Sequence, residues 1–295
     1  AFFLFFLPVR KLIVHERGTV WNQKSNNWAV PCFVAWKATL LLSNSLATKT
    51  MLVKKFSIPE RKIQVLHNGI NTSLNYDCSG NYEKNNSVFR IGFIGRLESH
   101  KGIHVLIDAM RYLSDANIKL IIAGEGELGS MLRNNASKLN NVKFIGRIKN
   151  PYSFMNTIDL LVVPSIREPL GNVCLEAGLC KVPVLATNVD GLPEIIDNGL
   201  SGELIDATDQ VLIDLPENSI PLPEFVVNPD TKNLDIPKQI NSSLLAKKIL
   251  ELSKNPKKLT VYADKLHDKV MSYFNIERYR SELHKIYREI YSSSK

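Results

Sequence analysis

The sequence contains little cysteine and no long hydrophobic run. None of its four cysteines stands in a C-x-x-C pair, which predicts reduced thiols in a cytoplasmic protein. The apolar run at the start, AFFLFFL, is seven residues long and is followed by Pro8. A membrane span needs roughly 18 apolar residues, and a signal peptide needs a basic flank and a small-residue cleavage site. We therefore expect neither a span nor a signal peptide.

Charge is plentiful but nowhere concentrated. The 295 residues are 44% hydrophobic and 22% charged, with a formal net charge of +8. This composition suffices for one large or two ordinary domains with hydrophobic cores. The sequence lacks an Arg/Lys block interleaved with aromatics, so we expect no nucleic-acid partner. Attraction to anionic substrates, attraction to an anionic membrane surface and a plain basic surface all fit the charge.

Several catalytic motifs are missing as well. The sequence has no H-E-x-x-H, no D-x-D pair, no Cys/His cluster and no nucleophile motif. These absences give no support to metal catalysis, and we expect neither a metal nor a cofactor.

What the sequence does have is a regular alternation of strand and helix patterns over residues 88–205. The apolar strand runs are VFRIGFIG, IKLIIAG, VKFIG, IDLLVVP, VPVLAT and GELID. Helical patterns fall between them near residues 101–113, 127–139, 151–157, 172–180 and 192–197. Continuous apolar strands separated by helices predict an α/β fold with a doubly wound parallel sheet. Such sheets bind ligands at the carboxyl ends of their strands.

We place a domain boundary in the polar, turn-rich stretch near residues 75–86. The expected parts are 1–85, a partial Rossmann-like N-terminal domain; 86–273, the complete sheet domain; and 274–295, a terminal helix. In the first part, residues 46–56 predict a helix with Ser45 as its N-cap. Residues 206–238 carry five prolines and no helical period, and predict an irregular surface excursion.

A first candidate site follows the strand that ends at Gly95. Arg96 and Lys101 lie in the loop GRLESHKG, and Lys101-Gly102 is expected to open the next helix. Both cations can then converge on one point above the sheet edge. There they would neutralise a diphosphate and stabilise charge on a leaving group. The alternative is a pair of solvated surface cations.

A second candidate is GEGELG, with Gly124, Glu125 and Gly126, which formally matches the dinucleotide fingerprint G-x-G-x-x-G. The next strand ends at Arg147 instead of the ribose-binding acid, so NAD does not fit and only NADP stays open. Backbone contact with a nucleotide base, shared with Arg147 and Ile148, is the other functional interpretation. The alternative without a ligand is that the glycines only shape a turn.

The stretch Ile158–Lys181 carries the third candidate. A helix opens near Gly171, so the first amides of that helix, at Asn172, Val173 and Cys174, have no intrahelical partner and can form an anion receptor. Two acids, Glu168 and Glu176, stand eight positions apart beside it. Acids next to an anion receptor suggest a ligand with both hydroxyls and phosphates, such as a nucleotide sugar. The alternatives are a hydrolytic carboxylate pair and a glutamate that complements the helix dipole.

Two weaker candidates complete the set. His15 ends a strand in the first part, where a lone histidine can be structural or functional. The loop 187–194 (TNVDGLPE) has good helix-start chemistry with or without a ligand.

These motifs, in order along residues 95–205, resemble the C-terminal half of retaining glycosyltransferases of family 4, which have the GT-B fold. The segment NSLATKTMLVKKFSIPERKIQVLHNGIN looks like the end of that family's first domain. The terminal FNIERYRSELHKIYREIY looks like helices that cross back to it. The opening strand and glycine-rich loop of the first domain have no counterpart here, so we expect an N-terminal truncation.

The resemblance implies a role for each candidate residue. Arg96 and Lys101 would bind the donor diphosphate together with the amides of 171–173. Glu168 would lie near the donor sugar and Glu176 on the ribose, while His15 would face the sugar from the first domain.

The implied activity is metal-independent transfer of a sugar from a nucleoside-diphosphate donor to a hydroxyl acceptor with retention. The family suggests polysaccharide or cell-envelope synthesis on a glycan or lipid-linked acceptor at the inner face of a bacterial membrane. The alternatives are a non-catalytic nucleotide-sugar-binding module and an NADP-dependent dehydrogenase.

Overall fold

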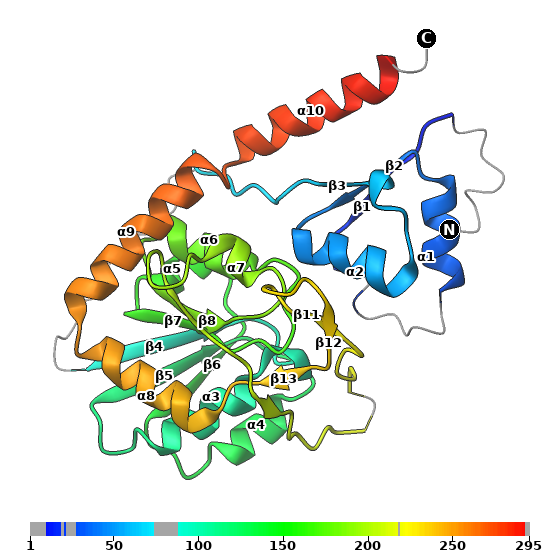
Figure 1. Cartoon of the computed structure of the whole chain (residues 1–295). Helices are drawn as coiled ribbons and strands as arrows, with labels where there is room; N and C mark the ends of the chain where they lie inside the picture. The colour runs from blue at the N-terminus through cyan, green and yellow to red at the C-terminus, as the bar shows by residue number, and fades with distance from the viewer. Residues whose placement is uncertain (1–9, 19–20, 22–27, 74–87, 218, 293–295) are drawn as a thin grey trace.

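The computed structural model describes residues 10–18, 21, 28–73, 88–217 and 219–292 (Figure 1). Its main feature is a sheet of six parallel strands in the order β6-β5-β4-β7-β8-β9. These strands are β4 (Phe89–Ile94), β5 (Ile118–Ala123), β6 (Val142–Gly146), β7 (Leu160–Val163), β8 (Val184–Thr187) and β9 (Glu203–Ile205). Every strand predicted between residues 88 and 205 is present, which confirms the doubly wound α/β fold.

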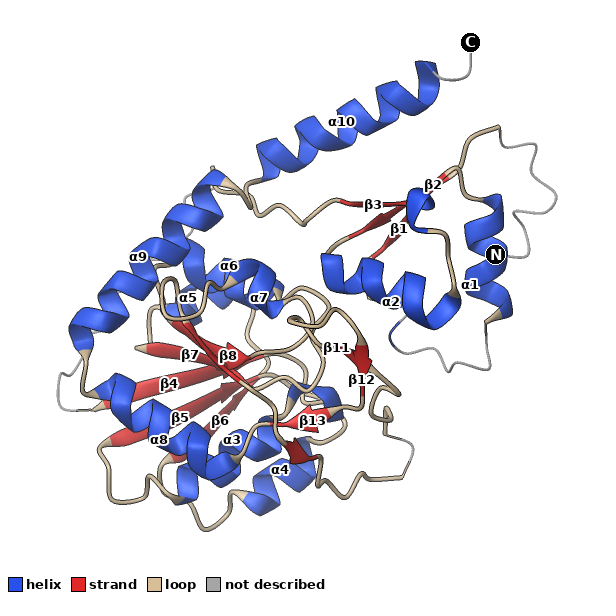
Figure 2. Cartoon of the chain, in the orientation of Figure 1, coloured by secondary structure: helices blue, strands red, loops and turns tan. Residues whose placement is uncertain are grey.

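Helices cover both faces of this sheet (Figure 2). They are α3 (Ile103–Arg111), α4 (Gly129–Asn135), α5 (Pro151–Met155), α6 (Asn172–Leu179), α7 (Leu192–Ile195), α8 (Ser242–Ser253) and α9 (Pro256–Ser272). Successive residues of one strand lie in the hydrophobic cores on opposite faces of the sheet. Leu160 packs in the core with α3 and α8, and Leu161 packs in the core with α6 and α9. Both side chains are fully buried, which explains why the strands are continuous apolar runs instead of alternating ones.

A smaller parallel sheet organises the first part of the chain. Its strands are β1 (Ile13–Glu16), β2 (Leu40–Ser43) and β3 (Ile63–Val65), with helices α1 (Ala29–Lys37) and α2 (Leu46–Phe56) and the 3-10 helix η4 (Glu60–Lys62). The helix predicted at residues 46–56 is confirmed, and the Ser45 side chain accepts a hydrogen bond from the amide of Thr48 as its cap. The expected boundary near 75–86 lies outside the described residues.

The C-terminal helix α10 (Ile276–Ser292) returns to this smaller sheet (Figure 1). Its buried Ile286 packs with Leu42 and Leu66 of the first part. The two chain segments also meet at a backbone bridge, where the amide of Ile70 donates to Phe274 O at 2.7 Å and the amide of Ile276 donates to Ile70 O at 2.8 Å. The terminal segment therefore joins the two parts.

The segment 206–238 differs from its prediction as a purely irregular surface excursion. It forms two short antiparallel ladders, β10 (Asp209–Gln210) with β13 (Lys238–Gln239) and β11 (Val226–Val227) with β12 (Leu234–Asp235). Val226 is buried in the core of the large sheet domain, and Val227 is buried against α2 of the first part. The prediction was wrong because two adjacent valines reach two different cores, a long-range effect that helical periodicity does not reveal.

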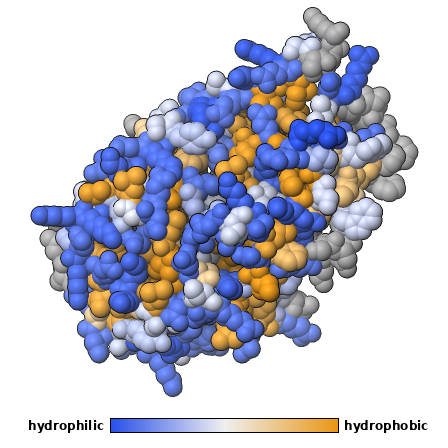
Figure 3. Space-filling view, in the orientation of Figure 1, coloured by the Kyte–Doolittle hydropathy of each residue, from blue (hydrophilic) through white to orange (hydrophobic). Residues whose placement is uncertain are grey.

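No helix of the described chain is long and apolar enough to cross a membrane. On the face seen in Figure 3, hydrophilic side chains predominate and hydrophobic ones show as separate patches.

Candidate active site

The loops after β4, β5, β7 and β8 meet at the carboxyl edge of the large sheet. They comprise residues 95–102, 124–128, 164–171 and 188–191. Backbone hydrogen bonds hold them together: the Ile166 amide donates to His100 O at 2.9 Å, and the Gly191 amide donates to Glu168 O at 3.1 Å. Candidate residues that lie far apart in the sequence thus share one edge, as expected for a parallel sheet.

Two glycines of GEGELG let the loops after β5 and β4 press together. Gly124 has φ +146°, and a Cβ there would lie 1.8 Å from Gly95 O. A Cβ on Gly126 would lie 2.6 Å from Leu97 O. Only glycine tolerates such contacts, so backbone packing accounts for both residues. The glycine pattern then needs no dinucleotide to explain it, and nothing else in the site favours the dehydrogenase alternative.

Lys101 and Glu168 form an ion pair at the centre of this edge. Lys101 Nζ lies 2.7 Å from Glu168 Oε2, and the side chains are 20% and 11% exposed. The Ser165 hydroxyl donates to the same oxygen at 3.2 Å. Lys101 ends the 3-10 helix η5 (Ser99–Lys101), and α3 begins only at Ile103. The expected helix start at Lys101 is therefore corrected: the 3-10 turn and left-handed Gly102 come first and turn Lys101 toward the β7 loop.

Arg96 does not share a hydrogen-bonding partner with Lys101 here. Its guanidinium Nη1 lies 2.6 Å from Glu98 Oε1, and its side chain is 70% exposed whereas that of Glu98 is 7% exposed. The expected convergence of both cations on one point is not seen, because each is held by a glutamate of its own. His100 is buried beside Glu98. Burial, together with the charges of Arg167, Lys101 and Arg96, lowers its pKa to about 2, so the imidazole is neutral.

Gly171 leaves the start of α6 without a side-chain cap. It has φ +100°, and a Cβ there would lie 2.7 Å from Leu192 Cδ2, so a larger residue does not fit. Because glycine offers no acceptor, the first amides of α6, at Asn172 and Val173, are not capped by it. The positive end of the helix dipole lies there too. This end of α6 therefore has the properties of an anion receptor.

Glu176 lies one turn further along α6 and faces a cavity of about 250 Å³ between the two parts of the chain. The polar lining comprises Glu176, Asn172 and Tyr152 from the large domain, Arg17 and Asn68 from the first part, and Tyr279 from α10. Burial raises the pKa of Glu176 to about 7. A half-buried carboxylate in a polar cavity suits recognition of hydroxyl groups.

The other expected donor-binding residues lie along the same edge. Glu125 and Arg147 are exposed, and Ile148 is half-buried at the margin of the core. A Cβ on Gly146 would be 3.6 Å from Glu125 Oε1, so the two loops adjoin. The Gly124 amide donates to Gly146 O at 2.8 Å and joins the two loops, whereas the side chains of Glu125 and Arg147 face solvent.

His15 approaches the site only through its loop. It is half-buried, and burial and the charge of Arg17 lower its pKa. At Gly18, two residues after β1, a Cβ would lie 3.2 Å from Pro169 Cγ, so this loop rests on the loop that carries Glu168. No contact of the described residues joins His15 itself to Lys101 or Glu168.

Two buried charged residues of the site were not singled out from the sequence, although Asp190 lies within the candidate loop 187–194. Arg167 is 5% exposed and Asp190 is 2% exposed. Asp190 Oδ2 accepts a hydrogen bond from the amide of Glu168 at 2.8 Å. Burial lowers the pKa of Arg167, whereas Glu168 and Asp190 raise it. The sequence signal was present, because Asp190 follows β8 at the predicted edge, but its burial could not be inferred from the loop composition.

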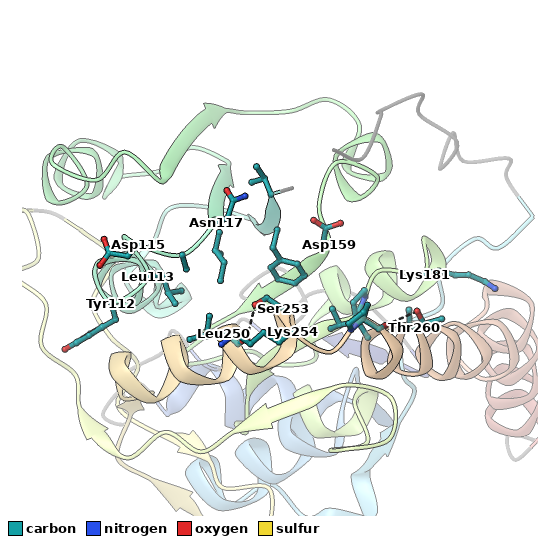
Figure 4. A pocket seen from close by; sticks show the side chains of 18 of the residues that line it. Tyr112, Leu113, Asp115, Asn117, Asp159, Lys181, Leu250, Ser253, Lys254 and Thr260 are labelled. Carbon is teal, nitrogen blue, oxygen red and sulfur yellow. Dashed lines mark hydrogen bonds between the residues drawn. The ribbon is translucent and has the colours of Figure 1, made fainter. Parts of the chain in front are cut away.

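A larger cavity of about 1090 Å³ lies at the opposite edge of the sheet. It is lined by Asn117 and Asp159, which precede β5 and β7, and by Tyr112 and Lys254 (Figure 4). It lies at the amino ends of the strands, away from the cluster described above. Among the described residues, no group of three or more His, Cys, Asp or Glu side chains could hold a metal ion.

Part of the chain resembles a known protein family. Residues 79–214 match the family model for glycosyl transferases group 1. An uncharacterized glycosyltransferase of Methanocaldococcus jannaschii is 32% identical over 57% of this chain and 47% of its own length. The capsular polysaccharide biosynthesis glycosyltransferase CapM of Staphylococcus aureus is 30% identical over 58% of this chain and 49% of its own length. The chain thus spans about half the length of the curated relatives it matches.

Solved structures extend the likeness over nearly the whole chain. HepE of Anabaena, in complex with UDP and glucose, matches with a TM-score of 0.75 and 22% identity, covering 95% of this chain and 72% of HepE. Sucrose-phosphate synthase of Thermosynechococcus elongatus matches with a TM-score of 0.72 and 18% identity, covering 95% and 67%. At these identities the likeness establishes the fold, which is the GT-B fold.

Proposed function

We propose that this protein is a glycosyltransferase that moves a sugar from a nucleoside-diphosphate sugar to a hydroxyl acceptor. The observation that carries the proposal is the Lys101–Glu168 ion pair beside the uncapped start of α6, with Glu176 one turn further along. A cation, free amides and two separated carboxylates match the phosphates and hydroxyls of such a donor. The match of residues 79–214 to the glycosyl transferases group 1 family model and the names of the relatives support it.

Each group has a distinct task in this proposal. Lys101 exchanges part of its contact with Glu168 for the donor diphosphate, whose charge increases as the glycosidic bond breaks. The amides of Asn172 and Val173 add fixed positive dipoles. Glu176 accepts from the ribose hydroxyls, and Glu168, released from Lys101, accepts from the hydroxyls of the transferred sugar. Arg96 swings from Glu98 to the distal phosphate, which its exposed position permits.

We place the protein in family 4 and propose that transfer retains the anomeric configuration, without a metal or cofactor. His15, Arg17 and Gly18 lie on the acceptor side, where their loop rests on Pro169. We propose a glycan or lipid-linked acceptor. Supporting this, a Campylobacter jejuni relative, 30% identical over 59% of this chain, is named as an N-acetylgalactosaminyltransferase acting on a diphospho-undecaprenol substrate.

The first experiment is a thermal-shift panel with UDP-glucose, UDP-N-acetylglucosamine, GDP-mannose and ADP-glucose, followed by nucleoside-diphosphate release with and without polyprenyl-linked acceptors. We expect donors with one base to raise the Tm, and the nucleoside diphosphate to be released as the sugar is transferred to the acceptor. NMR of the product should show the anomeric configuration of the donor. Failure of every donor to bind would reject the proposal.

The second candidate function is a nucleotide-sugar-binding module without catalysis. It is favoured by the pairing of both cations with glutamates, which holds them away from a shared point. Tight donor binding with no hydrolysis and no transfer in the same assays would support this candidate over the enzyme.

Attachment to the inner face of a membrane is a further part of the proposal, supported by the net charge of +8. Co-sedimentation with phosphatidylglycerol vesicles, but not with phosphatidylcholine vesicles, is the expected result. Equal recovery of the protein with both kinds of vesicle would contradict membrane attachment.

A further inference from the structure

A buried aspartate links the candidate active site to the segment 206–238. Asp190 is 2% exposed and adopts a left-handed conformation with φ 50°. One carboxylate oxygen, Oδ2, accepts from the Glu168 amide at 2.8 Å. The other, Oδ1, accepts from the Val227 amide at 2.6 Å, and the Asp190 amide donates back to Val227 O at 3.0 Å. The carboxylate therefore bridges two main chains that are 59 residues apart.

On the side of the site, this bridge fixes the residue that holds Lys101. The Glu168 amide is bound by Asp190, its carbonyl by the Gly191 amide at 3.1 Å and its carboxylate by Lys101 at 2.7 Å. The orientation of the Glu168 side chain thus depends on a backbone held at both ends by residues 190–191. The burial of Asp190 strengthens these bonds, because a carboxylate out of water binds amides more strongly.

On the other side, the bridge reaches the first part of the chain. Val227 belongs to β11, and its buried side chain packs in the core that includes Phe56 and Leu52 of α2. The partner strand β12 also lies against α2. The Asn233 side chain next to β12 accepts from Lys54 Nζ of α2 at 3.3 Å. The β11–β12 hairpin is therefore seated on the first part of the chain.

We propose that Asp190 is a positioning residue for Glu168 and that the β11–β12 hairpin, through Val227, forms part of the scaffold of the donor-sugar site. Asp190 does not touch the donor; it holds the Glu168 backbone in place relative to Lys101. The inference rests on the proposed function and adds a residue and a segment to it. It also assigns the segment 206–238 a role in sugar transfer, which is to support Asp190 and through it Glu168.

The test uses Asp190→Asn, which keeps the shape and one acceptor oxygen but turns an NH₂ group toward one of the two amides. Because Glu168 is assigned to the sugar and not to the nucleotide, turnover and nucleotide binding should separate. With UDP-glucose and UDP, or the GDP or ADP pair if the panel selects that base, we expect kcat to fall about 100-fold. We expect affinity for the nucleoside diphosphate to stay within about threefold.

Val227→Pro is the second variant: it removes the amide hydrogen that Asp190 Oδ1 accepts, and it also restricts φ and replaces the buried Val227 side chain. We expect a smaller loss of kcat, about tenfold, again without loss of diphosphate affinity. Asp206→Asn is the matched control: Asp206 is exposed at the same sheet edge and accepts only from the Asn188 side chain among the described contacts. Its kcat should equal that of the unmodified protein.

The outcomes separate this inference from the proposed function. If the unmodified protein neither binds the diphosphates nor turns over any donor, the proposed function fails and the inference falls with it. If the unmodified protein is active but Asp190→Asn keeps full turnover, the inference alone is overturned. The same holds if Asp190→Asn loses turnover and diphosphate affinity in parallel, which is the signature of a general structural role.

Discussion

The two parallel sheets of this protein use the ends of their strands differently. In the large sheet, the loops after β4 and β7 carry Lys101 and Glu168 close to an uncapped helix start and a cavity. In the small sheet, the polar residues after β2 cap a helix: Ser45 accepts from the Thr48 amide, and Thr48 Oγ1 donates to Asn44 at 2.8 Å. The same parallel topology thus places candidate site residues at the strand ends of the large sheet and helix-capping residues at those of the small sheet.

Residues that follow strands of the small sheet also form the contact between the two parts of the chain, which we call the Glu194 seat. Glu194 of α7 accepts from the first two amides of α2, Leu46 at 2.8 Å and Ala47 at 3.0 Å. Its carboxylate also lies 2.6 Å from His67 Nε2 in the segment after β3. A carboxylate of the large domain therefore takes the place that a ligand phosphate would take at a free helix start. A helix N-terminus is therefore an anion site only where the protein itself leaves it unoccupied.

The strongest way to break the comparison is to remove charge from the edge of the large sheet. We expect Lys101→Ala to lower kcat about 1000-fold, because a cation at the leaving diphosphate contributes about 4 kcal/mol to the transition state. Lys143→Ala, on the exposed face of β6, is the matched control and should leave kcat unchanged. Steady-state kinetics decides; equal rates for the two variants would contradict the assignment of Lys101.

The second prediction concerns the backbone packing of the site loops. Gly124→Ala should lower the free energy of unfolding by about 4 kcal/mol, because its φ of +146° and the 1.8 Å approach to Gly95 O leave no room for Cβ. Gly199→Ala has φ +74° but nothing within 4 Å, so it should cost only about 1 kcal/mol. Urea denaturation of both variants measures the difference. Similar losses would show that the close approach is relaxed in solution.

The Glu194 seat supplies the third prediction. Glu194→Ala leaves two helix amides and His67 without their acceptor, and we expect a loss of about 3 kcal/mol in the free energy of unfolding. Asp197→Ala breaks a more exposed ion pair with Lys269 and should cost less than about 1 kcal/mol. A loss confined to a first, separate unfolding transition would show that the first part detaches. Equal losses of unfolding free energy in the two variants would refute a stabilising role for the Glu194 contacts.

The smallest expected effect is the pH dependence that Glu176 adds. Its carboxyl titrates near 4.5 when unfolded and near 7 when folded. The folded protein therefore binds more protons in between, so the free energy of unfolding falls as pH rises from about 4.5 to 7. Glu176→Gln should remove this fall and stabilise the protein by about 2 kcal/mol at pH 8. Denaturation curves at pH 5 and pH 8 for both proteins test the sign.

The periodicity of the sequence determined the large sheet and the edge at which its polar residues lie. Six apolar runs separated by helix patterns define a parallel sheet, and loops that follow parallel strands emerge on the same side. This is why residues as far apart as Lys101, Glu168 and Glu176 could be assigned to one region. The helix at 46–56 was equally predictable, because its cap and its apolar face are local.

Only the tertiary structure decided which partners these residues have. Lys101 binds Glu168, 67 positions away, whereas Arg96 binds Glu98, two positions away. The burial of Asp190 and the seating of Val227 on α2 depend on where the segment 206–238 folds back. Such contacts arise from packing between distant elements, and periodicity reports only what a residue does within its own element. The sequence therefore determined that the polar residues lie at the carboxyl edge of the large sheet. The tertiary structure determined which of them contact one another there.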